Sequence, residues 1–299
     1  MATDDLRLRD ASAVLDKAAG ENFPVAPFFL PRAWRDDLMA VYGVVRLIDD
    51  IGDSDLAPEA AHARYLGLDP AHADDPPRLL DAVEADLGRL FDGGEPGHPL
   101  VRALRPTADR TAVTIDPFLG LIAANRQDQH VTRYETFDDL VAYCALSANP
   151  IGRLVLAITG TTTPERLRLS DAVCTALQIV EHIQDVAEDL RRDRIYLPIE
   201  DMLRFHVSEA DLAAPTAGAS VRALVAYETE RARCLLNEGT PLVGSVHGRL
   251  KLLLAGFVAG GRAAAQAIAA AGYDVLPGPP KPTKPRLLRE AGAVLRGEG

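Results

Sequence analysis

The chain is poor in cysteine and in aromatic residues. Its 299 residues include 3 cysteines, and Cys144, Cys174 and Cys234 lie far apart without a CxxC pair. This spacing gives neither a disulfide framework nor a thiolate zinc site. The aromatic residues (8 Phe, 7 Tyr and 1 Trp) are too few to suggest a surface on which bases stack. We therefore expect three reduced thiols, as in a cytoplasmic protein.

Positive charge and long apolar runs are also scarce. The chain has 43 acidic and 32 basic residues, a formal net charge of −11. Such a chain lacks the basic field that phosphate backbones require, which argues against a nucleic-acid partner. No apolar run reaches the roughly 18 residues that span a bilayer, and no apolar signal segment follows the charged N-terminus. These features favour a globular, cytoplasmic protein.

Helical periodicity runs through the sequence. Apolar residues recur at spacings of three and four, and neither strand alternation nor a hairpin dipeptide is found. The pattern predicts an all-α fold, with residues 1–299 as a single domain. Helices are expected to begin near Ala33, Arg78, Leu100, Pro117, Asp138, Pro164, Val221 and Gly248. Capping residues mark two of these starts, at Thr136 and at Thr163-Pro164.

Three segments have particular expectations. Residues 164–194 are apolar in the middle and predict a long helix that crosses the core. Residues 68–77 should form a loop. The basic, Pro-rich segment 277–285 should be extended and lead to a short last helix, Arg286 to Leu295. A solvated tail is the ordinary interpretation of this segment, and contact with an anionic membrane surface is the alternative.

Two segments share the same spacing of acidic residues along one helix face. A helix turns about 100° per residue, so Tyr42, Arg46, Asp49 and Asp53 fall within roughly 60° of one another. Gln178, His182, Asp185 and Asp189 do the same, with Glu181 at the edge of that face. Each segment therefore has a polar residue, an Asp seven residues later and a second Asp four residues after that.

Such paired aspartates indicate a metal site. Like charges at i and i+4 repel by a few tenths of a kcal/mol, and four carboxylates facing one cavity are costly unless cations fill it. Hard oxygen ligands suit Mg²⁺, which often bridges to substrate phosphates. A solvated helix face explains either motif alone. Their coincidence, with Arg46 and Arg191, Arg192 and Arg194 nearby, favours Mg²⁺ and a diphosphate. Plain C-terminal helix cations are the alternative for these arginines, and suit Arg191 and Arg192 better than Arg194.

At these motifs the chain resembles the squalene/phytoene synthase family. The matching pieces are Ala40-Val-Tyr42…Arg46…Asp49-Asp50-Ile-Gly-Asp53, Arg133-Tyr134-Glu135-Thr136-Phe137, Tyr143-Cys144 and Gln178…Asp185-Val-Ala-Glu-Asp189…Arg194-Ile-Tyr196. The resemblance covers roughly Glu21 to Gly272. It implies an isoprenoid-synthase helical bundle with a central cavity.

Within the family, the chain is similar to the bacterial hopanoid branch that makes hydroxysqualene. Four features carry this likeness: residues 21–25 (Glu-Asn-Phe-Pro-Val), residues 125–129 (Asn-Arg-Gln-Asp-Gln), residues 147–152 (Ser-Ala-Asn-Pro-Ile-Gly) and Gln184, where condensing members usually have Arg. The implied reaction is Mg²⁺-dependent conversion of presqualene diphosphate and water to hydroxysqualene and diphosphate. No NADPH is expected, since no GxGxxG fingerprint is present.

The resemblance also implies roles for individual residues. Asp49, Asp53, Asp185 and Asp189 match the metal motifs, with two or three Mg²⁺ ions expected. Arg46 and Arg194 match diphosphate-binding arginines, and Tyr42 and Tyr143 match tyrosines near the reacting carbons. Gln178 matches a family glutamine on the helix that carries the second aspartate motif. Glu181 replaces a usual Asn and could still ligate metal. Asn22, Asp128 and Asn149 are weaker candidates for polar groups that bind substrate.

Three other interpretations stay open. A condensing synthase would join two farnesyl diphosphates into presqualene diphosphate or squalene. A non-catalytic relative would use the fold for assembly or partner binding, although the intact Asp pairs argue against it. A di-iron bundle needs Glu-x-x-His pairs, which the long apolar helices lack. The histidines other than His182 (His62, His72, His98, His130, His206 and His247) show no ligand spacing and are expected at the surface or in loops. Pathway enzymes that supply or remove intermediates are conceivable partners.

Overall fold

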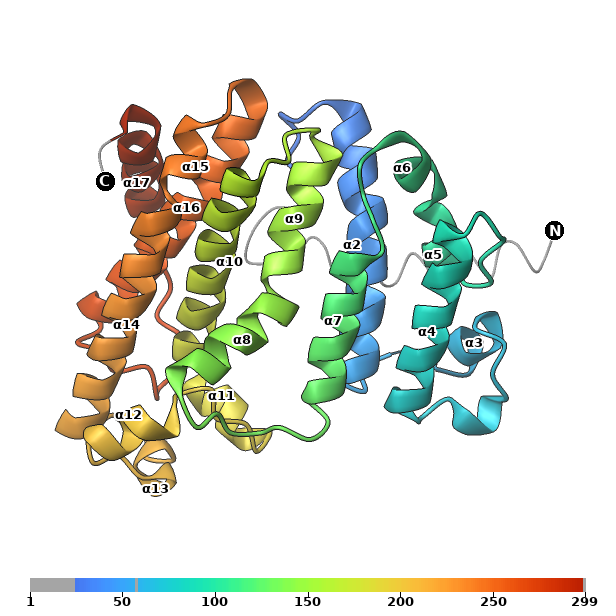
Figure 1. Cartoon of the computed structure of the whole chain (residues 1–299). Helices are drawn as coiled ribbons and strands as arrows, with labels where there is room; N and C mark the ends of the chain where they lie inside the picture. Colours follow the sequence, from blue (N-terminus) through green and yellow to red (C-terminus); the bar gives the residue numbers. More distant parts are fainter. Residues whose placement is uncertain (1–24, 57–58, 298–299) are drawn as a thin grey trace. The chain divides into compact units, whose positions relative to one another are not determined.

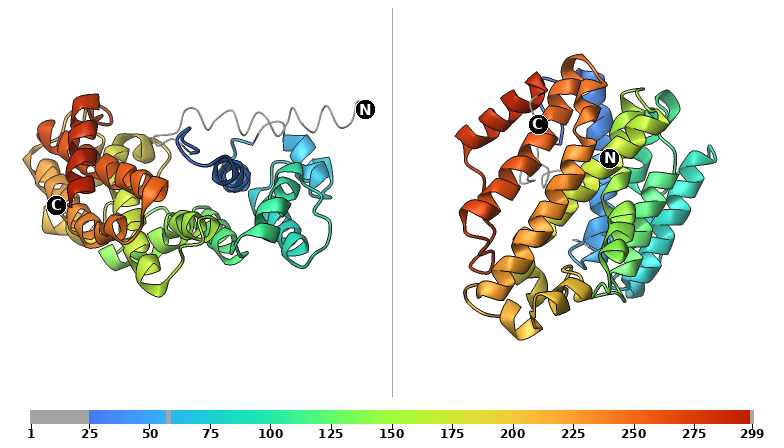
Figure 2. Two further views of the ribbon diagram at one scale, coloured as in Figure 1. Left: turned by 90° about the horizontal axis from the view of Figure 1, so that it is seen from above. Right: turned by 60° about the vertical axis from the view of Figure 1, so that its left-hand side comes forward.

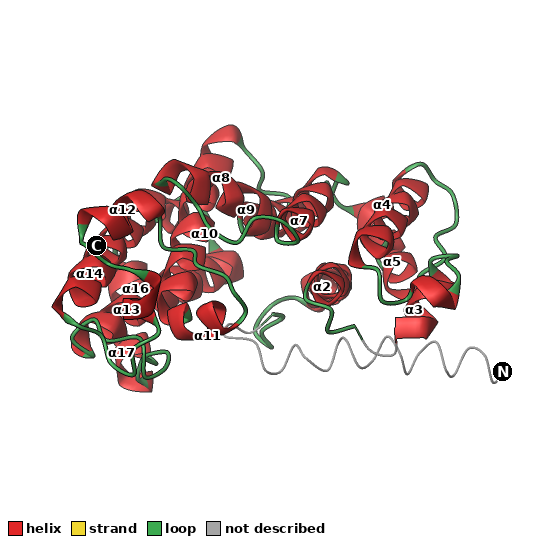
Figure 3. Ribbon diagram, turned by 90° about the horizontal axis from the view of Figure 1, so that it is seen from below, coloured by secondary structure: helices red, strands yellow, loops and turns green. Residues whose placement is uncertain are grey.

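The computed structural model describes residues 25–56 and 59–297, and its regular elements are helices (Figure 3). An isolated bridge between Arg133 and Ile195 is the β-type pairing found in these residues. The chain forms two compact units. The first unit comprises the described residues up to His130 together with 153–162, and the second comprises 131–152 and the described residues from 163 onward. The all-α prediction is confirmed, whereas the single-domain assignment stays a prediction.

The first unit is built around helix α2. Its helices are α2 (Arg32–Gly52), α3 (Glu59–Tyr65), α4 (Pro76–Phe91), α5 (Pro99–Ala103), α6 (Arg105–Arg110) and α7 (Asp116–Gln127), with a 3₁₀ turn at Pro70–His72 (Figure 1). Helix α2 packs on α4, α5 and α7. It buries Val41, Val44 and Ile48 at spacings of three and four, so its polar stripe lies on another face.

The second unit is layered around the pair α10 and α14. Its helices are α8 (Phe137–Ser147), α10 (Pro164–Gln184), α11 (Val186–Arg191), α12 (Ile199–Arg204), α13 (Glu209–Leu212), α14 (Ala219–Gly239), α15 (Pro241–Gly244), α16 (Gly248–Ala270) and α17 (Lys284–Arg296). Helix α9 (Asn149–Ile158) runs from this unit into the first. Gly239 permits the close packing of α14 on α10, because a Cβ there would lie 2.7 Å from the carbonyl oxygen of Leu169.

The predicted helix starts are confirmed to within two residues. Thr136 and Asp139 form a reciprocal capping box at α8, and the Thr163 side chain accepts from the Arg166 amide at the start of α10. The last helix is slightly longer than predicted, at Lys284–Arg296. All three cysteines lie in the described residues and are free thiols, as expected.

Two sequence expectations are wrong. Residues 164–194 do not form one helix, because the backbone at Asp185 leaves helical geometry (φ −101°, ψ 10°) and separates α10 from α11. His62 lies neither at the surface nor in a loop, because it is 1% exposed on helix α3. His98 lies in the loop before α5, as expected, but it is equally buried, and His62 Nδ1 lies 2.8 Å from His98 Nε2. Two lone histidines 36 positions apart leave no local pattern, so only the tertiary packing of α3 against the α5 start reveals this pair.

Two helical stretches, Phe137–Ile158 and Gly248–Ala270, are long and apolar enough to cross a membrane by length and composition. A count of uninterrupted apolar residues misses both. Half of the first window and 61% of the second are buried inside the protein. Buried core helices meet the same criterion, so these stretches are weak evidence for a membrane span.

Candidate active site

The first aspartate pair lies at the C-terminal end of α2. The Asp53 amide donates to the Asp49 carbonyl at 2.9 Å, which keeps the two residues one turn apart on one face. Asp49 is partly buried, and burial raises its pKa to about 7, although Asn125 and Arg46 act in the opposite direction. Asp53 is exposed and caps the helix. The pair thus consists of one desolvated carboxyl, Asp49, and one solvated carboxyl, Asp53.

Tyr42 and Arg46 lie on α2 before this pair, and both are partly buried. The Arg46 Nε atom lies 2.7 Å from Asp50 Oδ1, and the Asp50 side chain is 2% exposed. Asp50 therefore orients the arginine that the sequence predicts as a diphosphate ligand. No role was predicted for Asp50, although its i,i+4 spacing from Arg46 was a visible signal in the sequence.

Helix α7 supports the first pair from the side. The Asn125 Nδ2 atom donates to Asp49 Oδ1 at 3.2 Å and to the Leu121 carbonyl at 3.1 Å. The Gln129 Nε2 atom donates to the Gly52 carbonyl at 2.9 Å. A Cβ at Gly52 would lie 1.8 Å from Asn125 Oδ1, so only glycine allows this approach. Asn125 is a site residue that sequence reasoning missed, while the predicted Asp128 lies partly buried at the end of the same helix.

The second aspartate pair lies where α10 meets α11. The Asp185 carbonyl accepts from the amides of Glu188 and Asp189, both at 2.8 Å, so the two aspartates stay one turn apart despite the break. Burial raises the pKa of Asp185. Burial, with help from Asp185 and Glu188, raises the pKa of Asp189 to about 7. The Asp189 Oδ2 atom is buried and has no hydrogen-bond partner among the residues that the structure describes.

Arg194 follows this pair in the loop after α11, and hydrogen bonds fix this loop in place. Its amide donates to the Asp189 carbonyl at 2.9 Å, and its positive charge lowers the pKa of Asp189. The next amide, of Ile195, donates to the Thr132 carbonyl at 2.9 Å. Arg133 fastens the loop from the other side through Asp193 (2.8 Å) and Glu209 (2.9 Å). Arg194 is therefore held beside Asp189 by backbone bonds.

Aromatic rings gather near the second pair. The His182 and Tyr196 rings stack with centroids 3.6 Å apart, and Tyr134 and Tyr143 lie 5.7 Å from Tyr196. Burial lowers the pKa of His182 to about 3, so its ring is neutral near pH 7. Of these four residues the sequence predicted only Tyr143. Tyr134 and Tyr196 stood in the quoted motifs, but no spacing shows that residues 62 positions apart share a ring cluster.

The other predicted residues of the second unit have separate places. Gln178 Nε2 lies 3.2 Å from His182 Nε2, one turn along α10. Asn149 is buried, and its Oδ1 accepts from the Thr175 hydroxyl at 3.0 Å. Glu181 is exposed. Asn22 lies outside the described residues.

The aspartates fit Mg²⁺ in their chemistry. Within the described part of the chain, no group of three or more His, Cys, Asp or Glu side chains is arranged to hold a metal ion. Each unit by itself contains one pair of these carboxylates, Asp49 with Asp53 in the first and Asp185 with Asp189 in the second. Asp49 and Asp189 are desolvated, and no donor from the described part of the chain reaches the Asp189 Oδ2 atom. Uncompensated carboxylate oxygens of this kind are the hard ligands that Mg²⁺ prefers.

Comparison with known proteins decides the family. Residues 16–287 match the family described as Squalene/phytoene synthase. The chain belongs to this family. It is 31% identical over 232 residues to a hydroxysqualene synthase of Zymomonas mobilis, covering 77% of this chain and 72% of that protein. It is 32% identical over 225 residues to a 15-cis-phytoene synthase of Synechococcus elongatus, covering 71% and 68%.

Solved structures agree with the predicted fold. The chain is similar to squalene synthase HpnC from Alicyclobacillus acidocaldarius, with a TM-score of 0.76, 39% identity, and coverage of 88% of this chain and 94% of that one. A dehydrosqualene synthase in complex with ligand gives a TM-score of 0.81 at 22% identity, covering 98% of both chains. These likenesses confirm the isoprenoid-synthase helical fold. The predicted central cavity and the roles of individual site residues stay predictions.

Proposed function

We propose that this family member is a hydroxysqualene synthase, which converts presqualene diphosphate and water to hydroxysqualene and diphosphate. The observation that carries the diphosphate chemistry is the pair of desolvated carboxyls, Asp49 and Asp189, each beside a second Asp and an arginine. The hydroxysqualene branch is supported by 31% identity to the Zymomonas mobilis enzyme and 32% identity to a hydroxysqualene synthase of Rhodopseudomonas palustris. We expect it to act in the cytoplasm, without NADPH.

The residues would divide the work of ionisation. Asp49, Asp53, Asp185 and Asp189 would hold two or three Mg²⁺ ions, with Glu181 as a further candidate ligand. Bound Mg²⁺ would supply positive charge for the diphosphate that departs. Arg46, oriented by Asp50, and Arg194, fixed beside Asp189, would bind phosphate oxygens. The C–O bond to the diphosphate then breaks, and the bonding electrons leave with it.

The ring cluster would control what happens to the carbocation. Tyr134, Tyr143 and Tyr196 offer π faces, which stabilise a nearby cation without forming a bond to it. His182 is neutral and adds no opposing charge. Tyr42, Gln178, Asn149, Asp128 and Asn22 would complete the substrate contacts. One water adds through oxygen to the rearranged allylic cation, and its proton leaves with the diphosphate.

A product assay tests this proposal. Presqualene diphosphate and farnesyl diphosphate would be supplied separately, with Mg²⁺ and H₂¹⁸O and without NADPH, and the lipids extracted for mass spectrometry. An ¹⁸O-labelled alcohol from presqualene diphosphate alone is the expected result. Omitting Mg²⁺ should abolish it.

A condensing synthase is the second candidate, since the phytoene synthase of Synechococcus elongatus is as similar in sequence as the hydroxysqualene synthases. Head-to-head product from farnesyl diphosphate would establish that reaction instead. Absence of product from both substrates would favour a non-catalytic relative that acts in assembly or partner binding.

A further inference from the structure

The C-terminal segment reverses the charge of the chain. Between Pro277 and Arg296 there are five basic residues, Lys281, Lys284, Arg286, Arg289 and Arg296, and one acidic residue, Glu290. The segment therefore has a net charge of +4, in a chain whose formal net charge is −11. A cationic cluster concentrated at one end of an acidic protein indicates a partner of negative charge.

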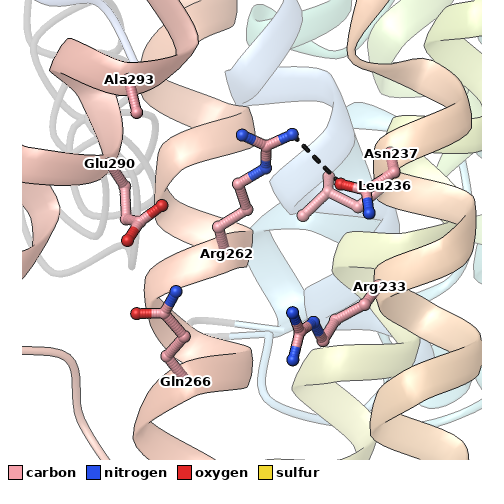
Figure 4. Close-up of a pocket in the computed structure, with 7 residues that line it drawn as sticks. All are labelled: Arg233, Leu236, Asn237, Arg262, Gln266, Glu290 and Ala293. Carbon is pink, nitrogen blue, oxygen red and sulfur yellow. Dashed lines mark hydrogen bonds between the residues drawn. The ribbon is translucent and has the colours of Figure 1, made fainter. Parts of the chain in front are cut away.

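Helix α17 turns its acid inward and its cations outward. Glu290 and Val294 are its buried residues, and α17 packs along α16 (Figure 2). Figure 4 shows Glu290 directed toward Arg262 and Gln266 of α16, in a pocket of about 250 Å³. The exposed positions of α17 carry Lys284, Leu288, Arg289 and Arg296, and no carboxylate.

An apolar side chain stands among these cations. Leu288 is 75% exposed, which places it among the few large apolar residues at the described surface. The neighbouring Arg289 lines a groove of about 400 Å³ between the end of α16 and the start of α17. Its walls include Ala267, Ala270 and Pro282, together with Lys281, Arg286 and Arg289. Aliphatic surface rimmed by cations fits a negatively charged amphiphile.

The basic segment is tied to the second aspartate motif. The Gln184 Nε2 atom donates to the Pro280 carbonyl at 2.5 Å, and Gln184 directly precedes Asp185. The cationic surface therefore begins beside the end of α10. A bilayer held there would lie next to one half of the proposed active site.

We propose that the exposed face of α17, with Lys281 and the groove beside it, docks the protein on bilayers that contain anionic lipid. Lys284, Arg289 and Arg296 would approach the headgroup phosphates, and Leu288 would enter the apolar boundary. Clusters of four or more basic residues near a surface act in this way, and an exposed apolar residue adds area. The use of this surface to receive a prenyl diphosphate from the membrane rests on the proposed function.

Vesicle flotation tests the docking without any substrate. The full chain would be mixed with vesicles of phosphatidylcholine alone or with phosphatidylglycerol, at 0.1 M and 0.5 M salt. The wild type should float with the anionic vesicles at low salt and much less at high salt. K284Q/R289Q should weaken this partition roughly tenfold or more. L288Q, which leaves the charge intact, should weaken it as well.

The matched control removes the same charge elsewhere. Arg32 and Arg64 are exposed residues of the first unit, so R32Q/R64Q should keep wild-type partition. Equal partition of K284Q/R289Q and this control would overturn the proposal, as would equal binding to neutral vesicles or none to either. Circular dichroism would verify that each variant is folded. Because flotation needs no turnover, its failure is distinguishable from failure of the product assay.

Discussion

The Nε atom of Arg46 lies 2.7 Å from Oδ1 of Asp50, one turn further along α2. Asp50 is almost fully buried, so the pair is held in a fixed geometry beside Asp49. The two aspartates, adjacent in sequence, thus have different tasks. Asp50 positions the arginine, and Asp49 stays available to a cation.

Asp50→Asn tests that division. Loss of the charged partner should cost about 1 to 3 kcal/mol of stability and raise KM for the diphosphate substrate, because Arg46 is no longer oriented. Urea unfolding and steady-state kinetics would measure both effects. Asp36→Asn is the control, since Asp36 pairs with Arg32 at the same spacing in the same helix but at the surface (3.7 Å). That change should cost less than about 1 kcal/mol.

Asp49→Asn and Asp185→Asn should each reduce turnover by orders of magnitude and leave the fold intact. Burial already favours the neutral form of both carboxyls, so an amide should not destabilise the protein. Turnover and thermal unfolding would be measured for each variant, and Mg²⁺ titrations should show weaker saturation. Glu188→Gln, an exposed neighbour on α11, should retain activity. A wild-type rate in both Asp variants would refute the metal assignment.

Gly52→Ala should disturb the first pair without touching a carboxylate. The added Cβ would overlap the Asn125 amide, which must then leave Asp49. We expect a loss of about 1 to 3 kcal/mol in unfolding free energy and a fall in activity. Gly88→Ala is the contrast, because among the described residues no atom outside the local helix backbone lies within 4 Å of a Cβ placed there. It should stabilise the protein by about 0.5 to 1 kcal/mol. Equal effects of the two substitutions would show that the contact of Gly52 with Asn125 is unimportant.

The His62–His98 pair should make the protein sensitive to acid. Burial, and then the neighbouring charges of His62 and Arg102, lower the pKa of His98 well below its ordinary value. The unfolded chain therefore binds a proton near pH 6.5 that the folded chain does not. The contribution of neutral His98 to the free energy of unfolding is therefore complete above that pH and is lost as the pH falls below it. This decline should appear as a difference between wild type and His98→Asn in thermal unfolding from pH 8 to 4. The raised pKa values of Asp49 and Asp189 favour the folded state on acidification, but they act in both proteins and cancel in the comparison.

Two substitutions identify the source of that decline. His98→Asn should flatten the dependence, although Tyr65 and Asp86 also contact the site of His98 and stay in place. His130→Gln should leave it unchanged, because His130 is exposed. A profile of equal slope in His98→Asn would assign the acid sensitivity to other groups.

Local signals predicted much of this protein. Thr136 and Thr163 marked helix starts because caps are local, and the Asp pairs were visible because i,i+4 spacing survives in the fold. The break at Asp185 was not visible, because neither glycine nor proline marks it. The ring cluster of Tyr134, Tyr143, His182 and Tyr196 was equally hidden, because it depends on which helices pack together.

The bond from Gln184 to the Pro280 carbonyl makes the C-terminal tail and the second aspartate motif one mechanical unit. Shortening the chain before residue 280 would therefore release an amide that directly precedes Asp185. Loss of activity in a truncated enzyme would therefore reflect loss of the Gln184–Pro280 hydrogen bond as well as loss of the C-terminal segment.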